Sequence, residues 1–128
     1  MEIDGIKILV VDDDMWMLKV LQKNLKHLGV TKVFTVDNGF DAVAIALAEI
    51  PDIIFLDLMM PELDGIQTLK MLKTIPQTRE IKVIICSGNT DVQNLGITIS
   101  LGANDYIAKP FTADTIKEKL NKNYHDIF

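Results

Sequence analysis

The sequence predicts an α/β fold in which a five-stranded parallel sheet is covered by helices on both faces. Short apolar segments alternate along the 128 residues with segments whose apolar residues recur at helical spacing. This order is typical of sheets built from strand–helix–strand units. Four of the five short segments are apolar nearly throughout, as expected of strands buried on both faces. No linker or repeat interrupts the alternation, so we expect one domain over residues 1–128.

The five predicted strands are short, and four of them finish on a polar side chain. They are KILVVD (7–12), VFTV (33–36), IIFLD (53–57), KVIICS (82–87) and DYIAK (105–109).

Five helical patterns alternate with these strands. Asp14 and Thr112 are expected to cap the first and last helices, and Gly29 and Gly102 to end the first and fourth. NLGITIS (94–100) holds a glycine and β-branched residues. The fourth helix is therefore predicted from its place in the alternation rather than from its helix propensity. The predicted inward faces are Leu18, Leu21, Leu25 and Leu28; Ala42, Val43, Ala46 and Leu47; Ile66, Leu69 and Leu72; Val92, Leu95 and Ile99; Ile116 and Leu120.

The composition excludes several classes of partner. The net charge is −5 and no cluster of Lys or Arg offsets it, which argues against direct nucleic-acid binding. Cys86 is the only cysteine, so no intrachain disulfide can form, and a reducing cytoplasm is the expected location. No apolar run approaches the length that spans a bilayer, so no membrane contact is expected. Most of the six methionines are expected to fill the core.

Polar residues gather where the predicted strands end. Asp12 and Asp13 follow the first strand, Asp57 ends the third, Ser87 ends the fourth and Lys109 ends the fifth. In open parallel sheets, ligands bind in the crevice at the carboxyl ends of the strands. We therefore expect these five side chains to share one site.

Three neighbouring carboxylates repel one another and raise one another's pKa unless a cation is present. Oxygen ligands of this kind suit Mg²⁺, which keeps several waters and takes one or two carboxylates. A lysine and a hydroxyl beside them suit a phosphoryl group, and a carboxylate can act as the nucleophile. Asp14 is assigned to helix capping, and His27 and His125 lie away from the predicted crevice.

Four segments of the chain resemble the receiver domain of two-component response regulators. They are ILVVDDD, PDIIFLDLMMPELDG, VIICSG and GANDYIAKPF, in this order, and the resemblance spans essentially the whole chain. It implies a flavodoxin-like fold with strand order 2-1-3-4-5. It also implies a single-domain signalling protein that acts through a protein contact, and not an enzyme that converts a separate substrate.

The resemblance assigns a phosphoryl-transfer site. Asp57 would take a phosphoryl group from a phosphohistidine of a sensor histidine kinase or phosphotransfer protein. Mg²⁺ would be held by Asp12, Asp13, Asp57 and the backbone carbonyl of Met59. Ser87 and Lys109 would contact the phosphoryl group.

The resemblance also assigns residues that read and time the signal. Ser87 and Tyr106 would form the switch that alters the binding face for a downstream protein. Met59 and Asn89 stand at positions that influence how long the phosphoryl group survives. The resemblance further implies a cis peptide between Lys109 and Pro110, and a protein that assists its own phosphorylation and dephosphorylation.

Two alternative functions stay open at this point. One is a receiver-like binding module that is never phosphorylated, although such modules usually lack one of the acidic residues or the lysine. The other is a phosphatase of the haloacid dehalogenase type, which also uses an aspartate, Mg²⁺ and a lysine. That family needs a second aspartate two residues after its nucleophile, and here that position is Met59, which cannot transfer protons.

Overall fold

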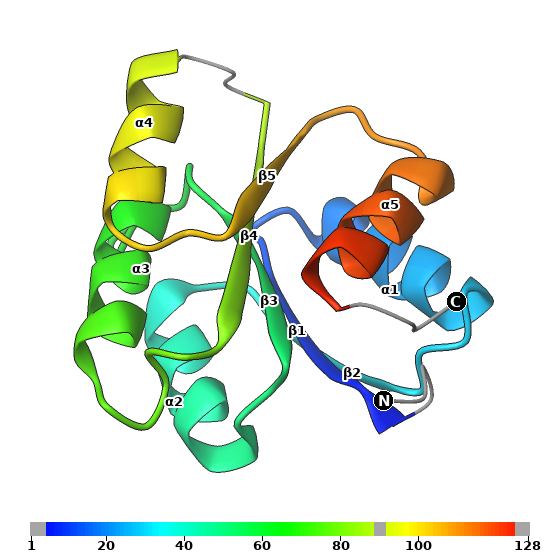
Figure 1. The fold of residues 1–128 in the computed structure, drawn as a ribbon, viewed down its shortest axis with the longest axis horizontal. Coiled ribbons are helices and arrows are strands. Elements are labelled where there is room, and N and C mark those ends of the chain that lie inside the picture. The colour runs from blue at the N-terminus through cyan, green and yellow to red at the C-terminus, as the bar shows by residue number, and fades with distance from the viewer. Residues whose placement is uncertain (1–4, 89–91, 125–128) are drawn as a thin grey trace.

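The computed structural model describes residues 5–88 and 92–124, which form the alternating fold that the sequence predicts (Figure 1). The strands are β1 (Lys7–Val11), β2 (Lys32–Val36), β3 (Ile53–Asp57), β4 (Lys82–Ser87) and β5 (Asp105–Ala108). The helices are α1 (Met15–His27), α2 (Gly39–Glu49), α3 (Gly65–Thr74), α4 (Val92–Ser100) and α5 (Ala113–Asn123).

All strand pairs are parallel, and the sheet has the order β2-β1-β3-β4-β5. This is the order that the resemblance implies. The register aligns the ends of the strands: Val11 pairs with Leu56, and Asp57 pairs with Cys86. The residues that follow these pairs therefore emerge together at one edge of the sheet.

The sheet separates two apolar layers. Helices α2, α3 and α4 lie on one face, and α1 and α5 lie on the other (Figure 1). The first core includes Val43, Leu69 and Leu72, whereas the second includes Leu21 and Leu120. Because β1, β3 and β4 contribute buried residues to both cores, the central strands are fixed from both sides, and so are the loops that follow them.

Within residues 5–88 and 92–124, four helices have a side chain as N-cap. Asp14 accepts a hydrogen bond from the backbone N–H of Trp16, and Thr112 caps α5, as the sequence predicts. Asn38 caps α2, and Asp64 forms a capping box with Gln67 at the start of α3. A capping residue satisfies N–H groups that the first turn of a helix leaves without a partner.

Two of the predicted inward helix faces each contain one residue that the structure exposes. Leu47 of α2 and Ile99 of α4 are 43 % and 50 % exposed, respectively. Among residues 94–100, the part of α4 whose burial the structure describes, Thr98 is the buried one, and its hydroxyl donates to the carbonyl of Leu95 at 2.8 Å. Ile99 follows Thr98 by one residue, about 100° around the helix, and so lies at the margin of the buried face.

The expected role of the methionines is also wrong for most of those that the structure describes. Met60 is buried, but Met15, Met59 and Met71 are exposed. Met15 and Met59 lie in or beside the loops after β1 and β3, where the chain leaves the sheet, so no second layer covers them. Within residues 5–88 and 92–124, no helix has both the length and the apolar character needed to cross a bilayer.

Candidate functional site

Three carboxylates meet at the carboxyl edge of the sheet. Asp12, Asp13 and Asp57 each offer an oxygen, and these oxygens all lie within 4.8 Å of one another. Asp12 and Asp57 are buried, whereas Asp13 is exposed. The cluster therefore has two fixed inner carboxylates and one that faces solvent, as expected from the ends of β1 and β3.

Lys109 joins the two inner carboxylates. Its ammonium donates to Asp12 Oδ2 at 2.7 Å and lies 3.5 Å from Asp57 Oδ1. The backbone N–H of Asp14 donates to Asp12 Oδ1 at 2.9 Å, so both oxygens of Asp12 are engaged. The peptide between Lys109 and Pro110 is cis, which confirms the sequence prediction.

The electrostatics of the cluster favour added positive charge. Burial, followed by the neighbouring charge of Asp12, raises the pKa of Asp57 to about 6. Lys109 and the backbone N–H of Met59 oppose this rise. Burial lowers the pKa of Lys109, but its hydrogen bond to Asp12 and the charge of Asp57 outweigh that cost and leave the pKa above its usual value. Two buried carboxylates share one ammonium, so a further cation is accommodated.

The other predicted site residues lie beside the cluster or on the strand next to it. Ser87 is buried at the end of β4, and its carbonyl accepts a hydrogen bond from the backbone N–H of Lys109 at 2.9 Å. Tyr106 lies on β5 and is 44 % exposed. Asn89 lies outside the described residues.

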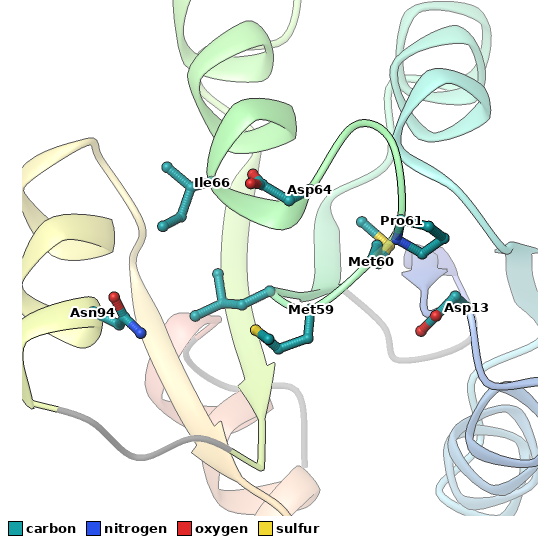
Figure 2. Close-up of a pocket in the computed structure, with 8 residues that line it drawn as sticks. Asp13, Met59, Met60, Pro61, Asp64, Ile66 and Asn94 are labelled. Atoms are coloured by element: carbon teal, nitrogen blue, oxygen red, sulfur yellow. The ribbon is translucent and has the colours of Figure 1, made fainter.

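Sequence reasoning did not identify the cavity next to the cluster. A hollow of about 390 Å³ lies between the loop after β3 and α4. In Figure 2, Asp13 stands on one side, Asn94 of α4 stands on the other, and Met59 lies between them. Met59 is 66 % exposed, and its side chain forms part of the lining. The signal for this hollow was the pair of methionines after Asp57, of which the resemblance assigned only Met59 to the phosphoryl site.

A profile of the response regulator receiver domain matches residues 8–121. The chain belongs to this family. Family members are signalling regulators that accept a phosphoryl group, and the buried acidic cluster fits such a site.

Two similar chemotaxis proteins support the assignment of the chain to the receiver family. The chemotaxis protein CheY of Bacillus subtilis (strain 168) is 36 % identical over 116 residues, which cover 91 % of this chain and 95 % of that protein. The chemotaxis protein CheY of Listeria monocytogenes serovar 1/2a is 36 % identical over 117 residues, which cover 91 % and 97 %.

Solved structures have the same fold. The chemotaxis protein CheY4 of Vibrio cholerae superposes with a TM-score of 0.87 at 24 % identity and covers 93 % of this chain and 98 % of its own. A response regulator described as putative from Chloroflexus aurantiacus J-10-fl has a TM-score of 0.86 at 25 % identity, with coverage of 92 % and 96 %. The first of these likenesses concerns the fold alone.

Proposed function

We propose that Asp57 of this receiver accepts a phosphoryl group from the phosphohistidine of a sensor histidine kinase or phosphotransfer protein. The observation that carries the proposal is the cluster of Asp12, Asp13 and Asp57 around the ammonium of Lys109. In the transfer, a carboxylate oxygen of Asp57 forms a bond to phosphorus. The bond from phosphorus to the imidazole nitrogen breaks, and that nitrogen keeps the electron pair.

The geometry favours Asp57 over its neighbours as the nucleophile. Both oxygens of Asp12 already accept short hydrogen bonds, at 2.7 and 2.9 Å. Asp57 Oδ1 has longer contacts, 3.5 Å to Lys109 Nζ and 3.5 Å to the backbone nitrogen of Met59. Asp13 is exposed at the rim. Asp57 is therefore the inner carboxylate that is held least tightly.

Mg²⁺ is the cofactor that the residues fit. Asp12, Asp13, Asp57 and the backbone carbonyl of Met59 would hold it, and hard oxygen ligands of this kind suit its preference. When bound, the ion supplies charge neutralisation to the transferring phosphoryl oxygens. Lys109 neutralises further charge from the buried side, and the hydroxyl of Ser87 donates to a phosphoryl oxygen. Through these groups the protein assists its own phosphorylation and dephosphorylation.

Met59 and Asn89 are the residues proposed to set the lifetime of the phosphoryl group. Met59 is two residues beyond Asp57 and is exposed at the cavity. An apolar side chain at this point hinders the approach of water to the phosphorus. Asn89 has the corresponding position two residues after Ser87.

The output is a change in a protein-binding face. Ser87 moves toward the phosphoryl group, and Tyr106 rotates into the space beside β5. The downstream target is a protein, with no direct nucleic-acid or membrane contact, and the receiver acts as one domain in the cytoplasm.

Intact-mass measurement after incubation with acetyl phosphate and Mg²⁺ tests the phosphoacceptor role. The wild type should gain the mass of one phosphoryl group, and Asp57→Asn, which removes the nucleophile at nearly constant shape, should gain none. Asp14→Asn is the matched control because it changes an exposed carboxylate of the same loop and still caps α1. It should behave as wild type.

The same experiment separates the two alternatives. A wild-type chain that stays unmodified would be the non-phosphorylated binding module. Continuous release of phosphate from phosphate esters, with no covalent product, would indicate a phosphatase. Equal mass gain in the wild type and in Asp57→Asn would assign the phosphoryl group to another residue.

A further inference from the structure

A second buried carboxylate site lies at the opposite end of β5. Among the residues that the structure describes, the buried charged side chains are Asp12, Asp57 and Asp105. The first two belong to the acidic cluster, whereas Asp105 begins β5 and faces α5. A buried carboxylate is costly unless it is paired, so its partners indicate what it stabilises.

Asp105 holds the end of Lys119 in place. The ammonium of Lys119, a residue of α5, donates to Asp105 Oδ1 at 3.0 Å, and the lysine side chain is only 16 % exposed. The backbone N–H of Tyr106 donates to the same oxygen at 2.8 Å. Burial raises the pKa of Asp105, but these two hydrogen bonds, together with the charges of Lys119 and Lys122, outweigh it and hold the pKa below its usual value. Asp105 therefore stays ionised and holds the ammonium of Lys119 in place.

The fixed ammonium also contacts the ring of the next residue. Lys119 Nζ lies 5.4 Å from the centroid of the Tyr106 ring. This distance is within the range of an attractive cation–π interaction. The ring is 44 % exposed, so it lies toward the surface at the edge of the sheet, beside α5. A long lysine side chain is otherwise costly to immobilise, but here the hydrogen bond to Asp105 already fixes the ammonium.

We propose that Lys119, held by Asp105, is the positioning residue that keeps Tyr106 in its outward orientation and so biases the switch toward the unphosphorylated state. This inference rests on the proposed role of Tyr106 as a switch. It adds the residue that sets the equilibrium between the two orientations of the Tyr106 ring. The structure has the ammonium beside the ring in its half-exposed orientation, and a ring that turned away from α5 would lose this contact. The contact therefore stabilises one of the two orientations, as a bias on a two-state equilibrium requires. A contact of this kind corresponds to about a two- to fivefold change in the ratio of the two orientations.

The test follows the Tyr106 ring directly. The chain has two tyrosines, so labelling with 3-fluorotyrosine gives two fluorine resonances, and Tyr124→Phe assigns that of Tyr106. Beryllofluoride with Mg²⁺, as a mimic of the phosphoryl group, defines the resonance position of the activated state. Lys119→Met should move the unliganded Tyr106 resonance toward that position. Lys119→Arg, which keeps the cation, should restore the wild-type position.

Lys122→Met is the matched control. Lys122 is also 3.5 Å from Asp105, through Oδ2, but its side chain is 64 % exposed, so its ammonium is not fixed as that of Lys119 is. Its loss should leave the Tyr106 resonance unchanged. Because Lys119→Met leaves Asp105 buried without its main partner, the double variant Asp105→Asn/Lys119→Met provides a neutral version that avoids an unpaired charge.

Beryllofluoride affinity gives a second readout with a distinctive sign. By linkage, a protein biased toward the activated orientation should bind beryllofluoride about two- to fivefold more tightly, whereas structural damage would weaken binding. An unmoved Tyr106 resonance together with unchanged or weaker beryllofluoride binding, in both Lys119→Met and the double variant, would overturn the proposal. Failure of the wild type to bind beryllofluoride would instead contradict the phosphoacceptor role. In that case an unliganded Tyr106 resonance that does not move in Lys119→Met would still overturn the proposal for Lys119.

Discussion

At Asp57, stability and function make opposite demands. The side chain is buried beside Asp12 and shares the ammonium of Lys109 with it. A nucleophile must be ionised, yet burial and the neighbouring charge of Asp12 raise the pKa of this carboxyl group to about 6. At neutral pH the folded protein therefore holds a buried negative charge that lowers its stability. A destabilising charge of this kind is typical of a functional site, here one that binds a cation.

This conflict predicts a pH-dependent effect of Asp57→Asn on stability. From about pH 4 to about pH 6, folded Asp57 keeps a proton that the unfolded chain has released, so the free energy of unfolding falls as the pH rises through this window. Asp57→Asn lacks this loss. Without Mg²⁺, the variant should exceed the wild type by about 1–3 kcal/mol at neutral pH and by little near pH 4.

Urea unfolding at several pH values in the presence of a chelator measures this difference. Added Mg²⁺ should reduce it by stabilising the wild type, and Asp14→Asn serves as the control outside the cluster. A difference that did not depend on pH would show that the charge of Asp57 is not the cause.

The position of Asp13 at the rim of the acidic cluster predicts that its loss will abolish metal binding. Trp16 is the only tryptophan and lies three residues after Asp13, with its backbone N–H bonded to Asp14. Mg²⁺ should change its fluorescence weakly but saturably, because the loop that carries both residues becomes fixed. Asp13→Ala should abolish the titration, and the same titration in this variant would place the metal elsewhere.

Site residues at strand ends were predictable, because chain order and the carboxyl-edge rule are sufficient to place Asp12, Asp57 and Lys109 together. The pair of Asp105 and Lys119 was not. These residues are 14 positions apart, on a strand and a helix, and only the way α5 packs against β5 brings them into contact. An aspartate at the start of a strand and a lysine on a helix are both common, so neither residue indicated this contact in the sequence.

Among the elements, α4 is the least determined by its own sequence. It spans Val92–Ser100 and has Gly96 near its middle. Its buried face is marked by Thr98 rather than by Ile99, because the tertiary packing decides which side faces the sheet. Local propensity therefore predicted neither the existence of this helix nor its orientation, whereas the alternation of strands and helices predicted its existence.

Gly96→Ala should stabilise α4. An added Cβ at this position meets nothing within 4 Å, and alanine in place of glycine in a helix interior contributes about 0.5–1 kcal/mol. Amide hydrogen exchange within Val92–Ser100 should slow by about two- to fivefold. Gly102→Ala is the contrasting variant: its φ of +108° and the Lys73 side chain 3.2 Å from the added Cβ predict a loss of stability. Faster exchange in Gly96→Ala would show that the glycine is needed for packing.

In the whole molecule, the distance from the acidic cluster to the proposed output face is short. Ser87 pairs with Ala108, and Tyr106 pairs with Ile85 on the same two strands. A displacement of Ser87 therefore reaches the strand that carries Tyr106 through one ladder of hydrogen bonds. Because β4 is buried from Val83 to Ser87, we expect its displacement to be transmitted to β5 rather than absorbed locally.

Ser87→Ala should separate phosphorylation from its readout. The variant keeps the nucleophile and the metal carboxylates, so Asp57 should still gain a phosphoryl group, although more slowly. The change in amide NMR shifts of residues 92–120 on addition of beryllofluoride and Mg²⁺ should shrink. Wild-type shifts in this variant would exclude Ser87 as the relay and point to Lys109 or to the loop after Asp57.

The most direct test of the account follows the site and the distal face in one sample. Amide NMR spectra are recorded for the wild type and Asp57→Asn during incubation with acetyl phosphate and Mg²⁺, with intact mass measured in parallel. The wild type should gain one phosphoryl group while resonances shift both around Asp57 and along β5 and α5, and Asp57→Asn should show neither change. A fully phosphorylated wild type whose β5 and α5 resonances stay in place, or an Asp57→Asn variant that reproduces the shifts, would contradict the account.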